Sequence, residues 1–299
     1  MSLNGWIIYN GVLPGQQFLD FANWLQNAAF LKNIKTVIYK NNELLAYLTG
    51  DSFDLLGDRT DLMPDFVIFT DKDIYLARQL ELLGIRVFNS AKAIEISDDK
   101  IATYQVLAQE KIDIPKTIIA PKTFGVQIKL ETSFSQYVED TLSFPMVLKE
   151  AYGSFGEQVY LVHTHEEMLS KVNELNGKPF VFQEFIATSY GRDMRLHVVG
   201  NQVVASMLRK SANDFRANIT AGGKMEQYYP TDVEQEMAIA ATKAIGADFA
   251  GVDLLFGPNN TPIICEINSN AHIRNMFECT NINVADFIIE HIINVLKDK

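Results

Sequence analysis

Short apolar runs alternate with stretches of helical periodicity across the first third of this chain. Between the first two runs, Phe18, Phe21 and Leu25 recur at the spacing of one helical face. Strands that alternate with helices indicate a parallel sheet built from βαβ units. Residues 1–92 are therefore predicted to form a small α/β domain, with strands at 6–9, 36–40, 65–70 and 85–88.

The rest of the chain shows a different pattern, in which strands follow one another through tight turns. Residues 200–201 and 257–260 are predicted to be turns between paired strands. Two Thr-x-x-Glu patterns, at 164–167 and 231–234, have the spacing of capping boxes and predict helix starts. The expected fold class is α/β, becoming α+β in the C-terminal part, with a central unit at 93–180 that contains a glycine-rich loop and a C-terminal unit at 181–299.

Composition excludes several classes of protein. The chain has 299 residues, of which 47% are hydrophobic and 21% are charged, a balance that gives a globular core rather than disorder. Its net charge of −11 disfavours nucleic acid and anionic membranes, which both attract a cationic surface. The two cysteines form no CxxC pair, and no apolar run approaches the ~20 residues of a membrane span. The first residues carry no basic leader, so we expect a cytoplasmic protein.

Acids interrupt the last two predicted strands, which cover 249–256 and 262–268. Asp253 lies in an apolar run, where a charge is costly unless it is paired or binds a metal. Because side chains alternate along a strand, Glu266 and Asn268 are expected on one face and Cys265 on the other. If the strands pair, Asp253 faces Glu266, and such oxygen ligands suit Mg²⁺ rather than zinc. The alternative is a salt bridge from each acid to a nearby arginine.

A glycine-rich loop, Gly153-Ser154-Phe155-Gly156, links two further predicted strands at 145–149 and 157–162. It is neither a Walker A loop nor a G-x-G-x-x-G fingerprint. Backbone N–H groups of a glycine loop can still approach phosphates closely, because no Cβ intervenes. Lys149, just before the loop, could supply a positive charge. The alternative is a plain hairpin turn.

Cations gather in one short stretch of a chain that is acidic elsewhere. Arginine forks match phosphate and carboxylate groups, so this cluster predicts recognition of such a group; the alternative is a solvated charged face. Asp193 and Arg195 are expected on one strand face, and His197 follows them as a candidate for the lining of a site. His163 and His165 lack further metal ligands. The cationic cluster comprises Arg192, Arg195, Arg209, Lys210, Arg216 and Lys224.

With these clusters in this order, the chain resembles the ATP-grasp superfamily, specifically its RimK-like branch of glutamate ligases. The resemblance runs from about Asn89 to the C-terminus, and it implies an ATP-grasp fold preceded by the small parallel-sheet domain. The strings that carry it are Asp99-Lys100, Val147–Glu150, Gly153–Gly156, Gln183–Ile186, Gly191–Arg195, Asp214–Asn218, Ala221–Gly223, Gly251–Asp253 and Glu266–Asn268.

The resemblance implies a role for each matching position. The lysines and the glycine loop would hold the phosphates of ATP, the backbone at 184–186 would hold adenine, and Asp193 would bind the ribose. Arg216 and Asn218 would lie at the transferring phosphate. The implied nucleotide-binding residues are Lys100, Lys149, Gly153, Ser154, Gly156, Gln183, Glu184, Phe185, Ile186, Asp193 and Arg209; the catalytic residues are Arg195, Arg216 and Asn218; the ligands of Mg²⁺ or Mn²⁺ are Asp253, Glu266 and Asn268.

One segment departs from the glutamate ligases, which follow the metal-binding Asn with a Ser-Pro-Gly turn. This chain has 269–275 instead, which is more like the ligases that modify an amino-group carrier protein. The resemblance therefore does not name the acceptor. Arg274 is predicted to meet a substrate carboxylate, because it lies just past the metal-binding strand, and Asn270 and His272 are candidate neighbours.

The implied reaction is ATP-dependent ligation of a carboxylate to an amine. Transfer of the γ-phosphoryl group makes an acyl-phosphate, which the amine then attacks with release of ADP and phosphate. Mg²⁺ and the cationic cluster would offset the repulsion between the carboxylate and the triphosphate. The glycine loop is the predicted lid that keeps water from the intermediate.

The implied substrates are a carboxylate and an amine, for example glutamate added to an amine of a small molecule, a peptide, a protein tail or a carrier protein. The family also implies an assembly of several copies. Two other functions are open: a non-catalytic ATP-binding regulatory module and a kinase that phosphorylates a small acid. The complete set of Asp253, Glu266 and Asn268 argues against the regulatory module, which has less need of a full metal site.

Overall fold

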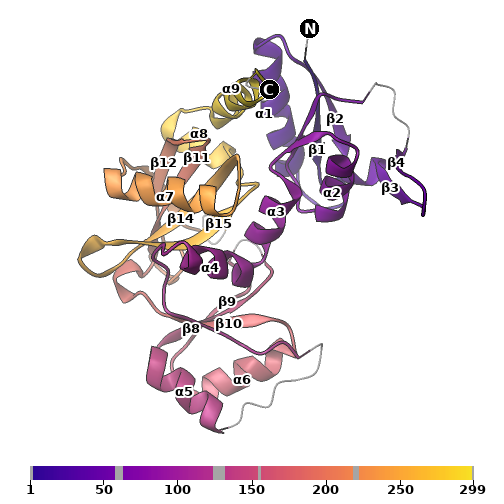
Figure 1. The fold of residues 1–299 in the computed structure, drawn as a ribbon. Coiled ribbons are helices and arrows are strands. Elements are labelled where there is room, and N and C mark those ends of the chain that lie inside the picture. Colours follow the sequence, from indigo (N-terminus) through magenta and orange to yellow (C-terminus); the bar gives the residue numbers. More distant parts are fainter. Residues whose placement is uncertain (1–2, 58–62, 124–131, 154–155, 218–221, 298–299) are drawn as a thin grey trace.

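The computed structural model describes residues 3–57, 63–123, 132–153, 156–217 and 222–297. A parallel sheet forms the N-terminal part, and two antiparallel sheets follow it (Figure 1). The mixed α/β class expected from the sequence is therefore confirmed. Among the described helices, none is both long enough and apolar enough to cross a membrane.

The N-terminal sheet contains the four predicted strands in the order β2-β1-β5-β6. Asp73 begins the second helix, because its carboxylate accepts a hydrogen bond from the Leu76 N–H at 3.1 Å. An additional two-stranded hairpin, which the sequence analysis missed, lies beside this sheet. The elements are β1 (Asn4–Tyr9), α1 (Gln17–Leu31), β2 (Lys35–Lys40), β3 (Leu45–Leu48), β4 (Phe53–Leu56), β5 (Phe66–Phe69), α2 (Ile74–Leu82) and β6 (Arg86–Phe88).

The central sheet has the strand order β7-β10-β8-β9, and helices α5 and α6 pack on one face of it (Figure 1). Thr164 caps α6 as expected, but Glu167 accepts from the His163 N–H rather than from Thr164, so the predicted capping box is only half formed. The elements are β7 (Thr117–Ile119), α5 (Thr132–Leu142), β8 (Met146–Glu150), β9 (Val159–Val162), α6 (His165–Leu175) and β10 (Phe180–Glu184).

The C-terminal sheet has the order β13-β12-β11-β14-β15, with α7 packed against it. Both predicted turns join paired strands, and Thr231 with Glu234 forms a complete capping box. The elements are β11 (Arg192–Val199), β12 (Gln202–Lys210), β13 (Lys224–Gln227), α7 (Asp232–Ala244), β14 (Phe249–Phe256) and β15 (Pro262–Asn268).

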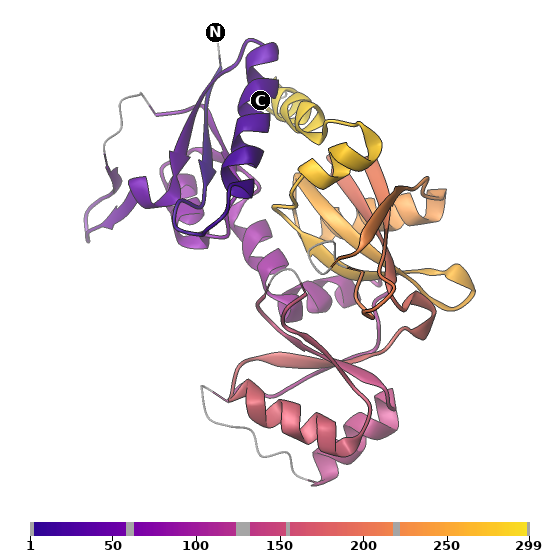
Figure 2. The same cartoon turned by 180° about the vertical axis from the view of Figure 1, so that it is seen from behind.

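Helices α3 (Ala91–Asp98) and α4 (Lys100–Gln109) run between the N-terminal domain and the central sheet (Figures 1 and 2). Helix α4 belongs by sequence to the predicted central unit. Its buried residues Tyr104 and Leu107 nevertheless pack into the core of the C-terminal sheet. This packing places Lys100, in the first turn of α4, where the N-terminal domain, the central sheet and the C-terminal sheet meet.

A bulge interrupts the pairing of β14 with β15. Asp253 lies opposite Glu266, as predicted, but the next pair is Leu254 with Ile264, which leaves Cys265 without a partner. An extra residue reverses the alternation of side chains. The expectation that Cys265 faces away from Glu266 is therefore wrong, because both side chains line the same cleft.

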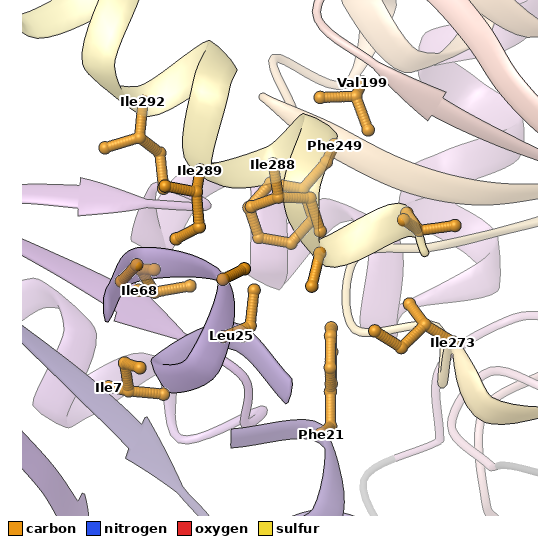
Figure 3. Packing of buried hydrophobic residues seen from close by; sticks show 14 of the residues in the cluster. Ile7, Phe21, Leu25, Ile68, Val199, Phe249, Ile273, Ile288, Ile289 and Ile292 are labelled. Atoms are coloured by element: carbon orange, nitrogen blue, oxygen red, sulfur yellow. The ribbon is translucent and has the colours of Figure 1, made fainter. Parts of the chain in front are cut away.

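The two ends of the chain share one hydrophobic core. Leu25 on α1 and Ile7 on β1 pack with Ile288 and Ile289 of the last helix, together with Ile273 (Figure 3). Helices α8 (Arg274–Thr280) and α9 (Val284–Lys297) close the chain.

Asn89, at the end of β6, fastens the N-terminal domain to the C-terminal sheet. Its fully buried amide donates to the carbonyls of Phe249 and Ser269, at 2.8 and 2.9 Å, and its oxygen accepts from the Asp248 N–H at 2.6 Å. This contact fixes the N-terminal domain above the ends of β14 and β15.

Candidate functional site

Two hollows meet at the acids of β14 and β15. The larger cavity, of about 540 Å³, lies between the N-terminal domain and the C-terminal sheet. The smaller cleft, of about 100 Å³, lies between the central and C-terminal sheets. Arg209, Asp253 and Glu266 line both. Ligands in the two hollows would therefore meet at these three side chains.

A buried network of two arginines and two aspartates forms this shared wall. Arg195 donates two hydrogen bonds to Asp253, at 2.6 and 2.7 Å. Arg209 holds Asp193 in the same way, at 2.6 and 2.8 Å, and also donates to Asp253 at 2.8 Å. Burial alone would raise the pKa of Asp253, but the two arginines outweigh it and lower the pKa to about 2. Asp253 is therefore ionised at neutral pH, and the salt bridge considered for it is present.

The predicted metal ligands lie on alternate rungs of the sheet, since Asp253 pairs with Glu266, Gly251 pairs with Asn268, and one pair separates them. All three side chains line the larger cavity. Glu266 forms a 3.6 Å ion pair with Lys100, and the buried Asn268 amide nitrogen has no partner. The described residues contain no group of three His, Cys, Asp or Glu suited to a metal, so the Asn268 oxygen would be needed. This all-oxygen set fits a hard divalent cation.

Two buried lysines line the smaller cleft. Lys100 donates to the Gly153 carbonyl at 3.1 Å. Lys149 donates to the Tyr104 hydroxyl at 3.1 Å and lies 3.7 Å from the Cys265 sulfur. The Tyr104 hydroxyl in turn donates to the Cys265 carbonyl at 2.8 Å. A tyrosine on α4 thus connects the lysine of the central sheet to the strand that carries Glu266.

The segment predicted to bind adenine lines the same cleft and gives it an apolar wall. The Phe185 ring makes edge contacts with Tyr190 and Phe215, and Gln183 donates to Thr117 at 2.9 Å. Asp193, expected at the ribose, also lines the cleft, although Arg209 already binds its carboxylate. The residues of this segment that line the cleft are Gln183, Glu184, Phe185 and Ile186.

Arg216 crosses the cleft. It forms an ion pair with Asp214 at 2.7 Å and donates to the carbonyls of Gly156 and Val159 on the central sheet. Its guanidinium therefore links the segment after β12 to the segment that leads into β9.

The glycine loop adopts backbone conformations that favour glycine, with φ of +150° at Gly153 and +75° at Gly156. Of the predicted site residues, Ser154 and Asn218 lie outside the described residues.

The residues after β15 divide into two groups. Asn270 and His272 line the larger cavity, and burial lowers the pKa of His272. Arg274 does not line it; its half-exposed guanidinium pairs with Asp20 of α1 at 2.7 Å. The prediction that Arg274 meets a substrate there is not supported, because α8 begins at this residue and turns it toward α1. Asn275, one residue later, lines the cavity instead.

His197 also lies outside both hollows. It lines a separate space of about 10 Å³ among apolar side chains, and burial lowers its pKa to about 3. The residue is a neutral core histidine, not part of the shared wall.

The sequence analysis missed several polar residues here, among them Asn10, Asn41 and Asp71, which line the larger cavity, and Tyr104, which binds Lys149 beside the smaller cleft. Tyr104 stands four residues after Lys100 on one helix, a spacing that puts both on one face. The other three follow the carboxyl ends of β1, β2 and β5, the edge where parallel sheets bind ligands. Both signals were present in the sequence.

Known proteins resemble this chain. A protein-family model described as the RimK-like ATP-grasp domain matches residues 97–292. The "Uncharacterized protein MG012 homolog" of Mycoplasma pneumoniae is 32% identical over 276 residues, which cover 89% of this chain and 94% of the relative. A probable alpha-L-glutamate ligase of Picosynechococcus sp. is 36% identical over 220 residues, or 73% and 70% of the two chains.

Among solved structures, the D-alanine–D-alanine ligase of Bacillus anthracis in complex with ATP has a TM-score of 0.73 and 18% identity, over 99% of both chains. The similarity to this solved structure concerns the fold, whereas the family model matches most of the sequence. The chain belongs to the RimK-like ATP-grasp family.

Proposed function

We propose that this chain is an ATP- and Mg²⁺-dependent carbon–nitrogen ligase that joins a carboxylate to an amine through an acyl-phosphate. The observation that carries the proposal is the shared wall: Arg209, Asp253 and Glu266 border both hollows. A nucleotide in the cleft and an acid in the cavity would meet there. Membership in the family, and the glutamate-ligase name of a relative, support the same reaction.

The smaller cleft would hold ATP. Lys100 and Lys149 place two positive charges at its inner end, and Phe185 and Ile186 offer an apolar wall for adenine. The Arg216 guanidinium donates hydrogen bonds to the carbonyls of Gly156 and Val159. On nucleotide binding it would turn from those carbonyls to the γ-phosphate.

Asp253, Glu266 and Asn268 would hold the divalent cation, whose charge offsets that of the triphosphate. Arg195 and Arg209 fix the Asp253 carboxylate in one orientation and keep it ionised. The Asp253 carboxylate would therefore already have its orientation when the cation binds.

In the reaction, an oxygen of the substrate carboxylate attacks the γ-phosphorus, and the bond from that phosphorus to the ADP oxygen breaks. The amine nitrogen then attacks the carbonyl carbon and loses a proton, and the bond to phosphate breaks. Arg195 and Arg209 would stabilise the negative charge that spreads over the phosphoryl oxygens. Closure by the segment around Gly153 and Gly156 would exclude water from the acyl-phosphate.

The test is hydroxylamine trapping with ATP, Mg²⁺ and a panel of amino acids and dipeptides as the acid. A ligase forms a hydroxamate with one acid and shows phosphate release that an amine stimulates. A regulatory module gives neither product, and a kinase gives phosphorylated acid without stimulation by amines. Glu266→Gln should lower the rate by about 100-fold or more, whereas Glu95→Gln, at an exposed ion pair with Arg78, should not change it.

A further inference from the structure

The larger cavity has a second polar wall, which the proposed reaction leaves without a role. It comes from the N-terminal domain and includes the amides and acids of Asn10, Asn41, Asp71 and Asp73, together with Lys72. None of these five lines the smaller cleft. A group bound at this wall would therefore lie away from the transferring phosphate.

The carboxylate of Asp71 is buried, and the hydrogen-bond donors described for it are neutral groups. Its side chain is only 4% exposed, and its carboxylate accepts hydrogen bonds from the Asn10 amide at 3.0 and 3.2 Å and from the Lys72 backbone. The Lys72 ammonium pairs with Asp98, and within the described ranges no ion pair involves Asp71. Burial raises the pKa of Asp71, and it outweighs the hydrogen bonds from Asn10 and the Lys72 backbone and the weaker attraction of the Lys72 charge, all of which lower it. A cation supplied by a ligand would remove this cost.

The neighbouring acid, Asp73, differs in its contacts. One of its oxygens accepts from the Leu76 N–H at 3.1 Å and the other from the Asn41 amide at 3.2 Å. Asp73 is therefore engaged in starting α2 and in holding a loop. It provides a matched carboxylate two residues from Asp71 in the same wall.

Asn10 is held so that it presents its amide hydrogens to Asp71. Its oxygen accepts from the N–H groups of Val12 and Leu13, at 3.0 and 2.8 Å, which fixes which way the amide points. Across the cavity, the Nδ1 atom of His272 is buried without a partner. The cavity thus offers an oriented carboxylate on one side and an unpaired polar atom on the other.

We propose that Asp71 binds an ammonium group of the ligase substrate, so that the larger cavity selects a free amino acid or a peptide with a free amino terminus. The ammonium lies against Asp71 and Asn10, and the reacting end of the same molecule lies at Asp253 and Glu266. This inference rests on the proposed function, because it takes the cavity to be the substrate site. The bound ammonium is an anchor and not the nucleophile.

The test measures binding of free L-amino acids and dipeptides, each beside its N-acetyl form, to the full chain saturated with Mg²⁺ and a non-hydrolysable ATP analogue. Calorimetry should find at least one probe that binds tenfold or more tightly than its N-acetyl form. Asp71→Asn should reduce that ratio to below twofold and leave the Kd of the ATP analogue unchanged. Asp73→Asn, in which asparagine still caps α2, should keep the ratio.

Three results would overturn the assignment: N-acetyl probes that bind as tightly as free ones, a ratio that survives Asp71→Asn, or an equal loss in Asp73→Asn. Absence of binding by every probe, while the ATP analogue binds, would overturn it too. Failure of the ligase proposal has a different signature, namely an ammonium preference that depends on Asp71 together with no hydroxamate and no amine-stimulated phosphate release.

Discussion

Asp253 shows how one residue can fit two sequence interpretations at once. An acid in an apolar strand predicted either a metal ligand or a salt bridge, and the structure has the salt bridge, with two arginines. Oδ1 accepts only one of the three hydrogen bonds, so one oxygen retains a free lone pair for a cation. The ion pair orients the carboxylate that the metal proposal requires.

Asp253→Asn should destabilise the fold in a pH-dependent way. Removing one charge from a buried pair costs about 3–5 kcal/mol of unfolding free energy at neutral pH. The pKa of Asp253 is lowered from 3.8 to about 2 in the folded state, so its contribution is complete above pH 3.8 and is lost as the pH falls toward 2. Urea unfolding at pH 7, 5, 4 and 3 should show the gap between wild type and variant narrowing only at the lowest values.

Asp20→Asn is the control for that measurement. It removes an ion pair with the half-exposed Arg274, which is worth at most about 1 kcal/mol. A gap for Asp253→Asn as small as that for Asp20→Asn, or one that stays constant down to pH 3, would contradict the role given to the arginines.

At the scale of elements, strand pairing was predictable and its irregularities were not. The sequence predicted that Asp253 would face Glu266 if the two strands paired as a hairpin, because alternation sets the face of each side chain and the turn sets the register. The bulge at Cys265 depends on how β15 fits its partner β14, which no local pattern encodes. The place of the Arg274 side chain was not predictable for a related reason. The residue lies close to β15 in the sequence, but α8 begins there and the side chain pairs with Asp20 of α1.

The close contact between β14 and the segment after β15 gives a prediction at this scale. A Cβ added at Gly251 would lie 2.4 Å from the Ala271 Cβ. Gly251→Ala should therefore destabilise the fold by about 1–3 kcal/mol and displace the segment that carries Asn270 and His272. Urea unfolding and the KM of the acid in the hydroxamate assay would report the two effects.

The double variant Gly251→Ala/Ala271→Gly is the matched control, because it moves the methyl group from one side of the contact to the other. It should recover most of the lost stability and restore the KM. An additive double variant would show that crowding at Ala271 is not the cause.

At the scale of the whole molecule, the sequence indicated three units but not the core that joins the first to the last. The apolar pattern of α9 predicts which face of this helix is buried. It does not predict that this face packs against Leu25 and Ile7. The same limit explains α4, whose position in the chain suggested the central unit although Tyr104 packs with the C-terminal sheet.

Because α1 and α9 share this core, a destabilising substitution in α9 should also destabilise the N-terminal domain. Both tryptophans, Trp6 and Trp24, lie in the N-terminal domain, so tryptophan fluorescence reports on that domain. Ile288→Ala on α9 should cost about 2–5 kcal/mol. Its unfolding midpoint in urea should fall equally by fluorescence and by far-UV circular dichroism.

Leu175→Ala, in the separate core of the central sheet, is the comparison. It should lower the circular dichroism midpoint more than the fluorescence midpoint. A fluorescence midpoint unchanged by Ile288→Ala would mean that α9 does not support the N-terminal domain.

The packing of α1 against α9 (Figure 3) also sets the order of events during synthesis. Leu25 emerges from the ribosome long before Ile288, and at roughly 5–20 residues per second the intervening segment takes on the order of 13–50 s to translate. Throughout that interval the nascent domain exposes an apolar helix face to the cell. A chaperone that binds apolar segments should therefore associate with the growing polypeptide early and leave only after α9 has been synthesised.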